Sequence, residues 1–208
     1  MAREEEQMTD ITSGRPTLGL WERRHQRFGL AGEGQADVIE SYLASHPGRI
    51  LYVGCGLGDY KFENLSKYGT DVVVIDRNDN MLRNAKEEAG DQPNIEFRVG
   101  DARNLEEFEK ESFDHILALG LFAYIHMHEV ETVFSQFWRV GRHGGYLMLT
   151  NATRHPKDAY IDAGLQCGFE LLRDKEGYCP AASSKRRYLL VFAKANAKGL
   201  PTRVAQQT

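Results

Sequence analysis

Cysteine is scarce in this chain of 208 residues. Cys55, Cys167 and Cys179 are an odd number of thiols at wide spacing, and no CxxC pair occurs. A disulfide framework or a cysteine-based zinc site requires more thiols at closer spacing. We therefore expect reduced cysteines, as in a cytoplasmic protein.

Long apolar runs and a surplus of positive charge are also lacking. No apolar run approaches the length that spans a membrane, and the first residues are acidic instead of resembling a secretory signal. The formal net charge is −4, whereas nucleic-acid-binding domains normally carry an excess of Lys and Arg. We expect a soluble, cytoplasmic protein without a nucleic-acid or membrane partner.

The hydrophobic content of 41% is sufficient for one well-packed domain. Residues 1–16 and 195–208 are polar, and we expect them to be flexible tails around a single domain at 17–194. Within it, short apolar runs rich in β-branched residues alternate with amphipathic stretches. The expected strands cover residues 49–53, 71–75, 95–99, 115–119, 146–150, 169–172 and 188–192.

This alternation predicts an α/β fold, namely a Rossmann-like, doubly wound and mostly parallel sheet with helices on both faces. No helix signal separates the last two apolar runs. They are therefore expected to pair as antiparallel strands at one edge of the sheet.

A glycine-rich turn follows the first expected strand. Gly54, Gly56 and Gly58 stand in the run Val53-Gly54-Cys55-Gly56-Leu57-Gly58-Asp59. Glycine lets backbone amides approach a nucleotide-like ligand closely, although such a turn alone is also found without any ligand. Dinucleotide-binding folds space their glycines as GxGxxG, so the spacing found here provides poorly for a pyrophosphate.

Two carboxylates follow the next two expected strands. Asp76 comes 22 residues after Gly54, where an acidic residue can accept hydrogen bonds from both hydroxyls of a ribose. Asp101 follows Gly100, where it could accept from an adenine amine while Ala102 offers a backbone donor to the ring. Met81 could lie against the adenine face or simply belong to the core.

These motifs, taken in order, resemble those of the class I S-adenosylmethionine-dependent methyltransferases, over roughly residues 35–194. The resemblance implies a seven-stranded sheet, with Asp76 on the ribose and Asp101 on the adenine amine of S-adenosylmethionine. It also implies that the turn around Cys55 holds the methionine portion and that Leu119 and Gly120 line the sulfonium side. The stretches that carry it are Val53–Gly58, Val74-Ile75-Asp76 with Met81-Leu82, Gly100-Asp101-Ala102, Phe113-Asp114, and Val140 to Leu147.

One position departs from the family pattern. Members usually carry an acid two residues before the first glycine, and this chain has Tyr52. Glu22 or Glu33 could supply the missing carboxylate. Arg77, beside Asp76, could instead favour the 2′-phosphate of NADP, which would make the protein an NAD(P) oxidoreductase.

The acceptor site is expected beside the loop that follows the fourth strand. His126 and Tyr124 are the candidates for a general base or polar anchor. His126 and His128 could also begin a metal site, but no third ligand follows at a suitable spacing, so we expect no metal. The residues expected to contact substrate are Phe122, Asn151 and, from a possible lid at 17–34, Trp21 and His25.

The sequence thus predicts methyl transfer from S-adenosylmethionine to a nitrogen or oxygen of a small molecule. Three alternatives remain open: methylation of RNA or protein, a cofactor-binding but inactive partner subunit, and the NAD(P) oxidoreductase.

Overall fold

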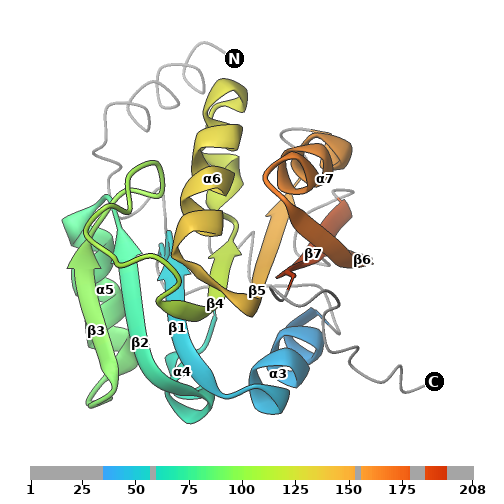
Figure 1. The fold of residues 1–208 in the computed structure, drawn as a ribbon. Helices are drawn as coiled ribbons and strands as arrows, with labels where there is room; N and C mark the ends of the chain where they lie inside the picture. Colours follow the sequence, from blue (N-terminus) through green and yellow to red (C-terminus); the bar gives the residue numbers. More distant parts are fainter. Residues whose placement is uncertain (1–34, 57–59, 153–155, 179–185, 196–208) are drawn as a thin grey trace.

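The computed structural model describes residues 35–56, 60–152, 156–178 and 186–195, which form a seven-stranded sheet with helices on both faces (Figure 1). The order across the sheet is β3-β2-β1-β4-β5-β7-β6, and β1 to β5 are parallel. The predicted α/β architecture is confirmed. The strands are β1 (Gly48–Val53), β2 (Gly69–Asp76), β3 (Ile95–Val99), β4 (Phe113–Leu119), β5 (Gly141–Ala152), β6 (Phe169–Tyr178) and β7 (Arg186–Lys194).

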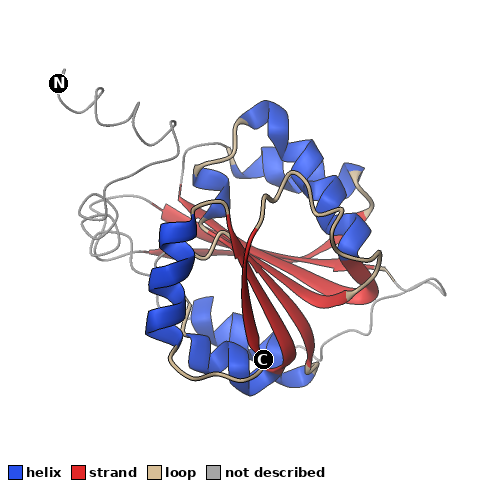
Figure 2. Ribbon diagram, turned by 90° about the vertical axis from the view of Figure 1, so that its left-hand side faces the viewer, coloured by secondary structure: helices blue, strands red, loops and turns tan. Residues whose placement is uncertain are grey.

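The helices form two layers, which Figure 2 shows on opposite sides of the sheet. Buried residues of α3 (Gln35–Ser45), α4 (Phe62–Tyr68) and α5 (Asp79–Ala89) pack on one face. Those of α6 (Val130–Val140) and α7 (Lys157–Gln166) pack on the other. Two short 3₁₀ helices, η1 (Leu121–Ala123) and η2 (Met127–Glu129), connect β4 to α6.

The β2–α5 unit shows how the sequence dictates these elements. Val72 to Ile75 are four consecutive β-branched residues with no exposed surface, as expected for a strand covered on both faces. The chain then turns into α5, whose N-cap Asn78 accepts a hydrogen bond from the backbone N–H of Asn80 at 2.9 Å. This turn fixes the position of Asp76 at the end of β2.

The reversed strand lies inside the sheet. β7 is antiparallel to both β5 and β6, which confirms the predicted antiparallel pairing, and β6 forms the outer edge. Leu189 to Phe192 in β7 are fully buried, whereas β6 carries the exposed Leu172 and the charged run 173–176. The more apolar strand therefore takes the covered position.

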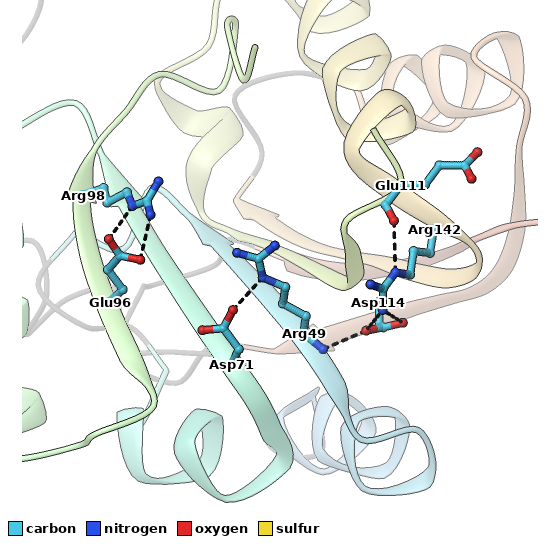
Figure 3. Close-up of polar contacts among 7 residues, drawn as sticks. All are labelled: Arg49, Asp71, Glu96, Arg98, Glu111, Asp114 and Arg142. Carbon is cyan, nitrogen blue, oxygen red and sulfur yellow. Dashed lines mark hydrogen bonds and ion pairs between the residues drawn. The ribbon is translucent and has the colours of Figure 1, made fainter. Parts of the chain in front are cut away.

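Charged side chains are paired near the amino-terminal ends of the strands (Figure 3). Asp114 of β4 accepts from the backbone N–H of Arg49 at 2.8 Å and from Nη1 of Arg142 at 2.9 Å, which ties β1, β4 and β5 together. Arg49 also pairs with Asp71 at 2.7 Å. Asp114 therefore has a structural role, far from the carboxyl-terminal ends of the strands.

Several predicted regions lie outside the described residues. These are the amino-terminal tail, the possible lid at 17–34, and all but Ala195 of the carboxyl-terminal tail. Among the helices that the structure describes, none is both long and apolar enough to cross a membrane.

Candidate active site

The strands β1 to β5 are parallel, so their carboxyl ends all lie on the same side of the molecule, toward which the arrowheads point in Figure 1. The backbone N–H of Gly54 donates to the carbonyl of Ile75 at 2.8 Å, and that of Gly100 donates to the carbonyl of Asp76 at 3.0 Å. The turns after β1 and β3 are thus fixed to the end of β2. Ligands bind at the carboxyl ends of the strands in open parallel α/β sheets.

The glycine turn has the backbone conformation that its sequence predicts. Gly54 and Gly56 have φ of +71° and +55°, values that L side chains rarely adopt. A Cβ atom at Gly54 would also lie 2.8 Å from Cδ1 of Leu121 in the loop after β4. Gly58 lies outside the described residues.

Asp76 is linked directly to this turn. Its Oδ2 accepts from the backbone N–H of Gly56 at 3.1 Å, and its Oδ1 accepts from that of Asn78 at 2.9 Å. Burial raises the pKa of Asp76, while these two hydrogen bonds and the charge of Arg77 oppose the rise. The carboxylate retains acceptor capacity for a ligand, because its two oxygens can together accept about four hydrogen bonds.

Asp101 lies on the neighbouring strand end, after β3. Its carboxylate accepts hydrogen bonds from Nε and Nη2 of Arg103 at 2.9 and 2.5 Å, and Nε of Arg77 lies 3.5 Å from Oδ2. Burial alone would raise the pKa of Asp101, but the hydrogen bonds and charge of Arg103, with the charge of Arg77, outweigh it and lower the pKa. The Asp101 side chain remains 31% exposed, so a ligand can still reach it.

Arg103 continues from Asp101 to the loop after β4. Its Nη1 donates to Oε1 of Glu129 at 2.5 Å, and Oε2 of Glu129 accepts from the backbone N–H of His126 at 3.0 Å. His126 is exposed at the N-cap of η2, and its ring stacks on that of His128 with centroids 5.6 Å apart. Tyr124 is 39% exposed. Both predicted catalytic residues therefore lie on a loop that Arg103 connects to the carboxyl end of β3.

Phe122 has a different environment from the one expected of a substrate contact. It is fully buried, with ring centroids 4.9 Å from Tyr160 and 5.4 Å from Phe134. Its aromatic side chain packs in the core between α6, α7 and the sheet. We therefore leave Phe122 out of the acceptor site.

Several other predicted cofactor contacts have buried side chains, so only their backbone can face a ligand. These residues are Cys55, Met81, Ala102 and Leu119. Tyr52 is also fully buried, within the core below α3, α4 and α5, and its ring lies 6.4 Å from that of Phe62. Tyr52, which stands where the family usually has an acid, therefore contributes to the packing of this core.

Some predicted residues are not described. Trp21, His25, Glu22 and Glu33 lie outside the described residues, and only the backbone of Asn151 is described, paired with Tyr188 between β5 and β7. Within the described ranges, no three His, Cys, Asp or Glu side chains are grouped so that they could hold a metal ion.

Sequence reasoning missed Leu121, Arg103 and Glu129. The last two left a weak signal. Arg103 follows two residues after Asp101, and Glu129 stands three residues after His126, which is the spacing of a capping box. Neither pattern indicates that the two side chains meet, because that contact joins separate segments of the chain.

Comparison with known proteins agrees with this geometry. Residues 50–145 match the family model described as a methyltransferase domain. Phosphoethanolamine N-methyltransferase 3 of Arabidopsis thaliana is 31% identical over 131 residues, which are 62% of this chain and 25% of that protein. Sterol 24-C-methyltransferase of Pneumocystis carinii is 28% identical over 171 residues, 74% of this chain and 45% of that protein. The chain thus spans less than half of the length of these relatives.

Among solved structures, a TehB-like S-adenosylmethionine-dependent methyltransferase from Corynebacterium glutamicum has a TM-score of 0.66 at 21% identity. The match covers 86% of this chain and 100% of that one, and it concerns the fold. The family model, the sheet order and the strand-end site agree. Residues 50–145 are a methyltransferase domain, and the described fold is that of the class I S-adenosylmethionine-dependent methyltransferases.

Proposed function

We propose that this protein transfers a methyl group from S-adenosylmethionine to a nitrogen or oxygen atom of a small molecule. The observation that carries the proposal is the hydrogen bond from the Gly56 N–H to Oδ2 of Asp76, with Asp101 at the next strand end. The hydrogen bond joins the glycine turn to Asp76, and the pairing of β2 with β3 brings Asp101 to the neighbouring strand end, an arrangement that can bind a nucleoside. Relatives named for phosphoethanolamine and sterol methylation support a small acceptor.

The residues at the strand ends fit the proposed cofactor. The remaining acceptor capacity of Asp76 suits the ribose hydroxyls, and Asp101 suits the exocyclic amine of adenine. The backbone of Ala102 is proposed to donate to the base. Gly54 and Gly56 keep the main chain close to the ligand, because their positive φ angles direct the turn without a side chain.

S-adenosylmethionine supplies a methyl group activated by its positively charged sulfur. The protein's own contribution is to hold the acceptor in line with that group and to keep water away. Gly120 and the backbone of Leu119 are proposed to form the wall at this point, with Asn151, Trp21 and His25 as further acceptor contacts. Tyr124 is proposed to anchor the acceptor.

His126 is proposed to take the proton that a hydroxyl or protonated amine loses on methylation. Its backbone N–H is held by Glu129, while its ring stays exposed and stacked on His128. The imidazole is therefore available to solvent and to an acceptor.

The test is transfer of labelled methyl groups by the full chain. S-adenosylmethionine labelled on the methyl group is incubated with phosphoethanolamine, other small amines and hydroxyl compounds, and then with a cell extract. We expect the label in a small molecule and loss of most transfer in His126→Gln. Label found only in RNA or protein would identify the alternative substrates, and donor binding without any transfer would identify an inactive partner subunit.

A further inference from the structure

Arg103 connects the two halves of the candidate site. Its guanidinium binds the carboxylate of Asp101 through Nε and Nη2 and that of Glu129 through Nη1. Asp101 belongs to the nucleoside side, after β3, and Glu129 belongs to the loop that carries Tyr124 and His126. The planar fork of arginine fixes both carboxylates in one orientation.

The charges along this chain of contacts are stable at neutral pH. Hydrogen bonds from Arg103 are the largest influence on Glu129 and lower its pKa, and the pKa of Asp101 is lowered as well. Both carboxylates raise the pKa of Arg103. The side chains of Arg103, Asp101 and Glu129 are 30%, 31% and 18% exposed, so solvent screens these ion pairs only in part.

Besides the ion pair with Arg103, the loop after β4 contacts the glycine turn that follows β1. Leu121, at its beginning, lies against Gly54, and Glu129, at its end, holds the His126 N–H. The loop is thereby fixed at one end by packing on the glycine turn and at the other by the ion pair with Arg103. A shift of the Asp101 carboxylate changes the second attachment.

We propose that Arg103 is a positioning residue that couples nucleoside binding at Asp101 to the conformation of the acceptor loop, residues 121–129. The inference rests on the proposed function, because it assigns the nucleoside to Asp101 and the acceptor to the loop. A ligand that fixes Asp101 also fixes the guanidinium, and through Glu129 it fixes the backbone beside His126. Because such coupling is reciprocal, a change at Glu129 must also alter nucleoside affinity.

The test uses Glu129→Gln. Glu129 binds Arg103 but not Asp101, so this variant removes a charge without altering the carboxylate proposed to bind the nucleoside. The probe is S-adenosylhomocysteine, titrated by calorimetry into the full chain. We expect its dissociation constant to rise about fivefold in Glu129→Gln, within the usual range of coupling. Glu131→Gln, an exposed position on α6, is the matched control and should bind like the unchanged protein.

Hydrogen exchange supplies a readout that general destabilisation does not imitate. In the unchanged protein, S-adenosylhomocysteine should slow amide exchange across residues 121–129. This protection should be largely lost in Arg103→Met at saturating ligand, and Arg103→Lys should restore it only in part because Lys lacks the fork.

The outcomes separate the two claims. If the unchanged protein does not bind S-adenosylhomocysteine, the proposed function fails and the coupling fails with it. If it binds, but Glu129→Gln has the same affinity and Arg103→Met the same loop protection, the coupling is wrong while the proposed function stands. If Arg103→Met does not fold, Glu129→Gln alone decides between these results.

Discussion

Leu121 occupies the space that a side chain at Gly54 would need. Its Cδ1 lies 2.8 Å from the position of a Cβ atom built on Gly54, whose φ is +71°. A side chain at Gly54 would require Leu121 to shift, and the positive φ would strain any L residue placed there. Gly54 is therefore the point at which the glycine turn packs against the acceptor loop.

Gly54→Ala should weaken binding of S-adenosylhomocysteine about tenfold or more, because a displaced turn or loop no longer presents its backbone correctly. It should also lower the free energy of unfolding by about 1–2 kcal/mol through its left-handed backbone. Calorimetry and urea unfolding measure the two effects. Gly90→Ala is the matched control, since Gly90 has φ of +65° but open space around it. It should lose stability alone, and equal loss of binding in both variants would contradict this account.

Asp76→Ala should weaken binding of the methyl donor by about 1.5–3 kcal/mol, the contribution of charge-assisted hydrogen bonds to two hydroxyls. Asp71→Asn, at the opposite end of β2, serves as the control and should bind normally. Unchanged affinity in Asp76→Ala would refute the assignment of this residue to the ribose.

The affinity should also depend on pH through Asp76. Burial raises its pKa, so on acidification the carboxylate is protonated at a higher pH than an exposed aspartate. A protonated carboxyl has less acceptor capacity, and donor affinity should therefore fall as the pH falls through that raised pKa. Titrations at descending pH should show this loss in the unchanged protein and a flatter profile in Asp76→Asn. Identical profiles would contradict the prediction.

Lys194 should stabilise the end of β7. Its side chain is almost fully buried, and Nζ donates to the carbonyls of Trp138 and Gly141, each at 3.0 Å, and lies 3.3 Å from Oε1 of Glu111. Lys194→Met leaves these acceptors without their donor and should lower the free energy of unfolding by about 2–3 kcal/mol. Lys86→Met, exposed on α5, should change it little, and equal stability of the two variants would contradict the assignment.

His115 should make stability depend on pH. It is buried, its Nε2 lies 2.5 Å from the carbonyl of His46, and its Nδ1 has no hydrogen-bond partner within the described part of the chain. Burial lowers its pKa in the folded state, so below pH of about 6.5 the unfolded state binds the proton more readily. Stability should be complete above this pH and decline as the pH falls.

Urea unfolding between pH 8 and 5 measures that decline. His115→Phe should flatten the profile, whereas His128→Gln, at an exposed position, should keep it. A profile that His115→Phe leaves unchanged would show that another group is responsible.

The sequence was sufficient to predict the strands and the strand-end chemistry, because local patterns determine both. The β-branched run of β2, the glycine turn and Asp76 are all encoded within short segments. The length of β5 was underestimated, since its first residue pairs with Phe113 across an irregularity in register. No local pattern of hydrophobicity marks such a pairing.

Other features depend on contacts between distant segments, which composition and periodicity do not encode. Phe122 was expected to face a substrate, but Phe134 and Tyr160 enclose it in the core. Asp101 was expected to accept from an adenine amine, and the sequence does not indicate that Arg103 and Arg77 also contact its carboxylate. The order of the last two strands likewise depends on which of them the rest of the fold covers.

Calorimetric titration of the full chain with S-adenosylhomocysteine and with NADPH, in the unchanged protein and in Asp76→Ala, tests the central claim most directly. The site described here predicts that S-adenosylhomocysteine binds, that NADPH does not, and that Asp76→Ala weakens the binding about 10- to 150-fold. Binding of NADPH alone, or of neither compound, would contradict the claim that this edge of the sheet holds an unphosphorylated nucleoside.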